Sequence, residues 1–204
     1  MSPRKTHPFS ARHHEMVAGE VLARWQRASG SAPLSLPVPI EMIIETVYGL
    51  RIVSERIPEG PGEQILGVLQ PADRTIVLNQ RHEELFVSVV GPEQFTLAHE
   101  LGHWLYDADD PAQGQLFDPA APPVFCRHLV NAARGDPARL REVNANKLAS
   151  SLLMPHDLLR REIDAPFSSY RCLAQTAATW GVSVQALTYR LEALELDWCL
   201  PDPR

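Results

Sequence analysis

The sequence has few of the features that mark membrane, secreted and nucleic-acid-binding proteins. No stretch approaches the ~20 consecutive apolar residues that a membrane-spanning helix needs. Arg4 and Lys5 have no apolar run behind them, which disfavours a signal peptide. The three cysteines are odd in number and widely spaced, as is typical of reduced thiols. Lys and Arg number 19 against 25 Asp and Glu, a balance that disfavours direct DNA binding. We therefore expect a cytoplasmic protein with no membrane partner.

The composition that is present indicates a globular protein with a buried core. Of the 204 residues, 45% are hydrophobic and 22% are charged, which excludes a disordered scaffold, a fibre and a coiled coil. Apolar periodicity and turn residues predict a helix between Ser10 and Gly30, helices at 40–48, 92–106, 136–154, 157–163, 168–180 and 183–194, and strands at 51–57, 65–70 and 75–79. From residue 92 onward we expect only helix and loop. Because no helix of crossover length separates the strands, the expected fold is α+β and mostly helical, with a small, mainly antiparallel three-stranded sheet.

One segment carries residues suited to metal chemistry. His99 and His103 are four residues apart on the predicted 92–106 helix, so both imidazoles project from one face and can reach the same ion. Glu100 lies about 100 degrees around the helix from His99, where it can take a proton from a water on that ion. Gly102, an unfavourable residue inside a helix, leaves room for a neighbouring element. The segment predicts a zincin-like helix.

A catalytic zinc typically has three protein ligands, so a third must lie elsewhere in the chain. Asp109 follows His103 by six residues, but the glycine that such an arrangement needs at the turn is absent. His128 lies in an irregular, proline-rich region. Glu142 is favoured, because it begins a helical face of small and apolar residues on which a carboxylate needs a charged or metal partner. Asn146, one turn later, is placed to orient that carboxylate.

The sequence resembles the ImmA/IrrE family of zinc-dependent metallopeptidases. The resemblance covers most of residues 38–196 and is carried by residues 94–103, by Glu142, Ala145, Asn146, Ala149 and 152–155, by 180–183 with Ala186, Leu187, Arg190 and Leu191, and by the strand 75–79. It implies that His99, His103 and Glu142 bind Zn²⁺ and that Glu100 is the catalytic carboxylate. It also implies that the substrate is a protein, typically a helix-turn-helix repressor encoded nearby and cleaved in a stress response.

Two other functions remain open at this point. The chain is alternatively a non-catalytic zinc-containing regulator that binds a repressor. It is otherwise a DNA-binding regulator that uses its C-terminal helices, since Gly181 and Ser183 give residues 173–194 the pattern of a helix-turn-helix. Residues 168–197 carry two arginines against three acidic residues, which disfavours this last reading.

The expected organisation has three parts. Residues 1–37 form an N-terminal helix and proline-rich linker, 38–164 the metallopeptidase core, and 165–204 a C-terminal helical subdomain packed on that core. His13 and His14 are expected to be exposed residues of the first helical turn. The candidates for stabilising the oxyanion of a cleavage reaction are Tyr106, Tyr170 and His156, and either strand of the 65–79 hairpin is a candidate to pair with a substrate.

Overall fold

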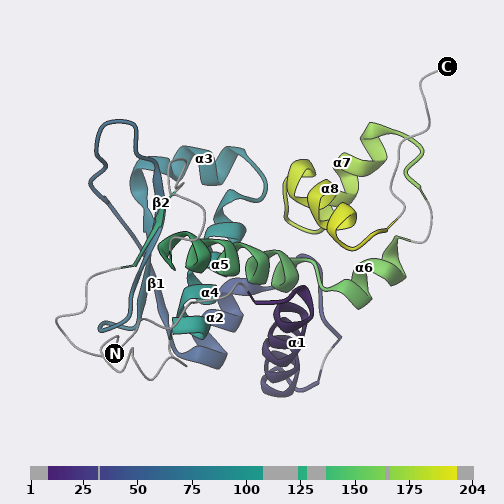
Figure 1. The fold of residues 1–204 in the computed structure, drawn as a ribbon, viewed down its shortest axis with the longest axis horizontal. Coiled ribbons are helices and arrows are strands. Elements are labelled where there is room, and N and C mark those ends of the chain that lie inside the picture. Colours follow the sequence, from purple (N-terminus) through teal and green to yellow (C-terminus); the bar gives the residue numbers. More distant parts are fainter. Residues whose placement is uncertain (1–8, 32, 108–123, 128–136, 164–165, 197–204) are drawn as a thin grey trace.

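The structure is a computed structural model that describes residues 9–31, 33–107, 124–127, 137–163 and 166–196. A small sheet lies at one side, the helices α4 (Pro92–Asp107) and α5 (Pro137–Leu153) occupy the centre, and α6 (His156–Glu162), α7 (Tyr170–Thr179) and α8 (Val184–Ala193) lie at the other side (Figure 1). The predicted α+β class, with helices dominating, is confirmed.

The sheet has four strands in the order β1-β3-β2-β4, with bounds β1 Arg51–Glu55, β2 Ile65–Gln70, β3 Thr75–Asn79 and β4 Val124–Arg127. β2 pairs antiparallel with β3 and with β4, whereas β1 pairs parallel with β3. β4 corrects the expectation of helix and loop alone beyond residue 92. The parallel pair arises without a crossover helix because β2, the intervening strand, lies on the other side of β3.

This order also corrects the idea that a hairpin strand pairs with a substrate. β3 lies between β1 and β2, and β2 lies between β3 and β4. The backbone groups on both edges of each hairpin strand are therefore engaged within the sheet, since a strand has only two edges.

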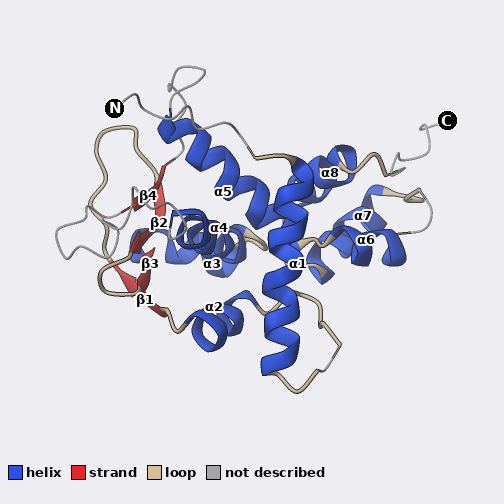
Figure 2. Ribbon diagram, turned by 60° about the horizontal axis from the view of Figure 1, so that its bottom comes forward, coloured by secondary structure: helices blue, strands red, loops and turns tan. Residues whose placement is uncertain are grey.

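The helices begin and end close to the predicted positions. The N-terminal helix, α1 (Ala11–Ala28), is capped by the Ser10 hydroxyl, which accepts from the His13 N–H, and α2 (Ile40–Tyr48) ends at a left-handed Gly49. The short helices η1 (Gln80–His82) and α3 (Glu83–Ser88) were not predicted, because segments of three and six residues are too short to show a helical period. Figure 2 shows the sheet at the left and α1 to the right of the centre.

α4 is held between the sheet and the other helices by small residues. Leu97, Ala98 and Leu101 are fully buried in the core. On the sheet side, a Cβ added to Gly67 of β2 would lie 2.6 Å from the Cγ2 of Thr96, so only glycine permits this approach. The close contact fixes the distance between β2 and α4, the helix that carries both histidines.

The C-terminal helices are fastened to the rest of the chain. In the turn between α7 and α8, Gly181 packs against Pro37. A Cβ added to Gly91 would lie 2.7 Å from the backbone nitrogen of Ser183, so these two segments are in close contact. The buried Arg190 of α8 lies 2.7 Å from a carboxylate oxygen of Glu15 in α1. The helix-turn-helix-like segment therefore rests on α1 and on the N-terminal end of α4. Among the described residues, none of the helices combines the length and apolar character required to cross a bilayer.

Candidate metal centre

The two histidines of α4 face the same point. The Nε2 atoms of His99 and His103 lie 2.9 Å apart, and each side chain is 1% exposed. Their rings are steeply inclined to one another, with centroids 4.6 Å apart. This follows from the four-residue spacing on a helix, which places both side chains on one face.

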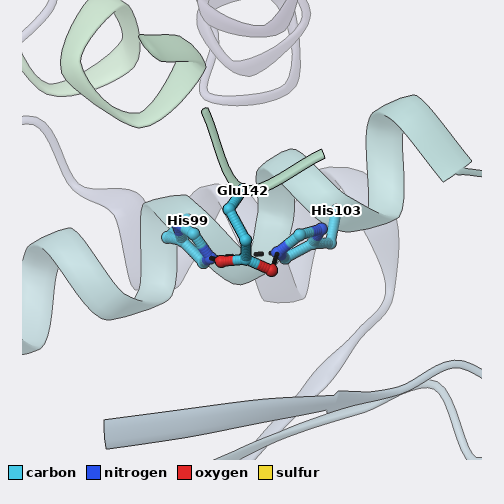
Figure 3. A group of neighbouring side chains, drawn as sticks. All are labelled: His99, His103 and Glu142. Carbon is cyan, nitrogen blue, oxygen red and sulfur yellow. Dashed lines mark hydrogen bonds and ion pairs between the residues drawn. The ribbon is translucent and has the colours of Figure 1, made fainter. Parts of the chain in front are cut away.

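Glu142 approaches the histidines from α5 (Figure 3). Its Oε2 lies 3.3 Å from Nε2 of His99, and its Oε1 lies 3.4 Å from Nε2 of His103. One ligand atom from each of these residues lies within 4.8 Å of the other two. The approach depends on Gly102, where an added Cβ would lie 3.1 Å from the Cα of Ala145 in α5. The neighbouring element for which Gly102 leaves room is therefore the helix that carries Glu142.

Asn146 contacts a histidine in this structure. Its Oδ1 lies 2.8 Å from Nδ1 of His99, so the amide oxygen accepts a hydrogen bond from the Nδ1–H tautomer. The sequence had suggested that Asn146 orients the carboxylate of Glu142 instead. A hydrogen bond at Nδ1 leaves the lone pair of His99 on Nε2, the atom that faces His103 and Glu142.

The charges around this cluster favour an anionic Glu142. Burial alone would raise its pKa, but hydrogen bonds and charge interactions with His103 and His99 outweigh burial and hold the pKa at about 2. Burial lowers the pKa of His99, and the hydrogen bond and charge of Glu142 oppose this effect. A carboxylate and a neutral imidazole are the protonation states in which these side chains bind metal ions.

Glu100 is a fully buried carboxyl group beside the cluster. Neither of its oxygens has a hydrogen-bond partner of ordinary geometry. Burial raises its pKa to about 8, with the charge of Glu142 adding to the effect and the charge of His103 and the Leu69 backbone opposing it. A buried carboxyl group without partners is costly, so its position requires an explanation beyond packing.

Residues 46–192 match the family described as IrrE N-terminal-like domain, Peptidase_M78. The chain belongs to this family. The match spans more than half of the sequence and includes α4, α5 and all residues of the cluster. No protein in the set of curated proteins compared with this chain matches it. The resemblance stated from the sequence is thereby confirmed, and the Peptidase_M78 assignment places the chain among peptidases.

The residues present fit a divalent metal ion in this Peptidase_M78 domain. Two imidazole nitrogens and one carboxylate oxygen form a donor set that suits zinc, and catalytic zinc sites keep a further position for water or substrate. The buried carboxyl group of Glu100, with both oxygens lacking partners, is the second observation that fits an ion and its water at this point.

Several other candidate residues are not brought to the cluster or lie outside the described residues. Asp109 and His128 lie outside the described residues. The Tyr106 hydroxyl shares a hydrogen bond with Nδ1 of His14, Tyr170 is 63% exposed on α7, and His156 pairs with the adjacent Asp157. Within the described part of the chain, these three oxyanion candidates therefore have surroundings other than the cluster.

Two features of the Peptidase_M78 domain were missed from the sequence. His14 was expected to be exposed, but it is 1% exposed and lies against Tyr106 and the backbone of Phe9. Gly67 permits the close approach of α4 to the sheet beside Glu100, since a Cβ there would lie 2.6 Å from the Cγ2 of Thr96. A glycine inside a strand was the available signal for a close approach, whereas nothing local distinguishes His14 from an exposed histidine.

Proposed function

We propose that this chain is a zinc-dependent endopeptidase in which His99, His103 and Glu142 hold the metal ion and Glu100 is the catalytic carboxylate. The observation that carries the proposal is the convergence of the two α4 histidines and the α5 carboxylate beside a buried carboxyl group without hydrogen-bond partners. A bound Zn²⁺ would lower the pKa of a coordinated water and polarise the carbonyl of the scissile peptide.

A side chain of the protein would carry out the proton transfers of the reaction. Glu100 accepts a proton from the attacking water and delivers it to the leaving amine, as a general base and then a general acid. A raised pKa suits this exchange, because the group must take and release a proton near neutral pH. Asn146 holds the His99 ring in the orientation that presents Nε2.

We further propose that the substrate is a cytoplasmic regulatory protein, with a helix-turn-helix repressor encoded nearby as the first candidate. Support comes from membership of a peptidase family and from the resemblance to ImmA/IrrE proteins in the sequence blocks around His99 and Glu142. The docking of the helix-turn-helix-like segment against Pro37 and Gly91 fits a structural role for α7 and α8 within the peptidase.

The decisive experiment compares the wild type with Glu100→Gln. Both proteins are loaded with zinc, their metal content is measured, and each is incubated with the repressor encoded nearest to the gene. We expect equal metal content, cleavage by the wild type and loss of at least about 100-fold in rate for the variant, the scale of a general base. Equal cleavage by both proteins would exclude Glu100 as the base. Binding of the repressor without cleavage by the wild type would favour the non-catalytic regulator.

A further inference from the structure

Along α4, a line of residues at helical spacing runs through the metal cluster and continues beyond it at both ends. Phe95 lies one turn before His99, and Tyr106 lies three residues after His103, so both aromatic rings share the face of the histidines. Both are only partly buried. The two rings therefore flank the candidate metal centre along the helix.

The Tyr106 flank is filled by the chain itself. The ring of Phe9 lies 4.8 Å from that of Tyr106, His13 stacks at 5.9 Å, and His14 lies edge-on at 5.7 Å and shares a hydrogen bond with the hydroxyl. The rings of the segment that opens α1 thus occupy the surface next to Tyr106. A ligand side chain has little room there.

The Phe95 flank differs from the Tyr106 flank. Phe95 packs partly against the hydrophobic core, and within the described residues its aromatic ring contact is with His99, at 6.3 Å between centroids and 35° between planes. The segment that leads into α4 also exposes apolar side chains, with Val87 83%, Val89 44% and Val90 52% exposed. Exposed apolar side chains therefore stand in the segment that leads into the helix carrying this candidate metal ligand.

We propose that Phe95 forms the wall of a substrate subsite that takes an apolar side chain adjacent to the scissile bond. This inference rests on the proposed function, because it places the substrate at the His99, His103 and Glu142 cluster. The occupant is an aliphatic side chain, since the Phe95 ring offers apolar area and no hydrogen-bond partner. Burial of a leucine-sized side chain typically strengthens binding by about tenfold or more.

The test uses hydroxamates, which chelate a metal ion directly, with zinc-loaded protein. Binding of acetohydroxamate, which has no side chain, is compared by calorimetry with binding of N-acetyl-leucine hydroxamate. For the wild type we expect the leucine compound to bind about tenfold more tightly. For Phe95→Ala we expect this preference to fall to about twofold with acetohydroxamate affinity unchanged, and for Phe95→Leu we expect the preference to remain.

The outcomes separate the two levels of the proposal. Equal affinities of the two compounds for the wild type, or an unchanged preference in Phe95→Ala, would overturn the subsite while leaving the metal centre intact. Absence of hydroxamate binding to wild type that contains zinc would overturn the proposed function and the subsite with it. If circular dichroism shows that Phe95→Ala does not fold, Phe95→Gln, which keeps more of the volume and is polar, replaces it with the same expected result. Tyr170→Ala, which removes an exposed aromatic side chain of α7, is the control and should retain the full preference.

Discussion

The Oδ1 of Asn146 lies 2.8 Å from Nδ1 of His99, one helical turn beyond the carboxylate that faces Nε2 of the same ring. Both groups come from α5, so one helix supplies a ligand and fixes the orientation of another ligand. Replacement of the residue that orients a metal-binding histidine typically lowers metal affinity by about 10–100-fold.

We therefore expect Asn146→Ala to lower zinc affinity by about 10–100-fold with little change in the free energy of unfolding of the metal-free protein. Competition with a chromophoric chelator measures the affinity. Asn146→Asp, which keeps an acceptor oxygen for the Nδ1–H, should recover most of the loss. Lys147→Ala, at the next and exposed position of α5, is the control. An Asn146→Ala protein with wild-type affinity would show that this hydrogen bond has no role in metal binding.

The packing of α4 on α5 predicts a specific effect of a single methyl group. In Gly102→Ala the new Cβ would lie 3.1 Å from the Cα of Ala145 and 3.2 Å from its carbonyl oxygen, so the two helices must separate. We expect a loss of about 1–3 kcal/mol in the free energy of unfolding and weaker zinc binding, because Glu142 moves with α5. Urea denaturation and metal titration measure the two effects.

Gly19 in α1 provides a matched control for this substitution. It is also a helical glycine, but no atom lies within 4 Å of the position of an added Cβ. Gly19→Ala should therefore raise the free energy of unfolding by up to about 1 kcal/mol, the helix-propensity difference, and leave zinc binding unchanged. Similar effects of the two substitutions would contradict the view that α4 and α5 are in critical contact at Gly102.

The buried His14 predicts a pH dependence of stability. Burial lowers the pKa of its imidazole from 6.5 to about 4, with the charges of Lys147 and His13 adding to the effect and the Phe9 backbone and Glu15 opposing it. Tyr106 is the remaining titratable group against this ring. Between pH 6.5 and 4 the unfolded chain binds a proton at His14 that the folded chain does not, so the free energy of unfolding decreases as the pH falls through this range.

The measurement compares urea midpoints at pH 7, 6 and 5 for the metal-free wild type and for His14→Gln. We expect a smaller decrease for the variant, whose side chain does not titrate. His13→Gln removes a charge that contributes to the lowered pKa of His14, so it should reduce the decrease less than His14→Gln does. Parallel decreases for wild type and His14→Gln would show that other groups dominate the acid destabilisation.

Local patterns were sufficient to predict most of the elements. The hairpin strands and α2 have the bounds expected from apolar periodicity and turn residues, and Ser10 and Ser183 cap the helices α1 and α8. The strand β4 was not predicted because its four residues follow a proline-rich segment and form a strand by pairing with β2. β-Strands depend on partners that are distant in sequence, and short ones carry little periodicity of their own.

The sequence by itself determined that His99 and His103 share one helical face with Glu100 beside them, because an α-helix repeats every 3.6 residues whatever surrounds it. It also favoured Glu142, through the apolar stripe on which that carboxylate begins. Only the tertiary structure decided that Asn146 contacts His99 and that the His14 and Tyr106 side chains meet on one flank of the cluster. Contacts between helices depend on interhelical distance and rotation, which here are set by glycines packed against distant backbone.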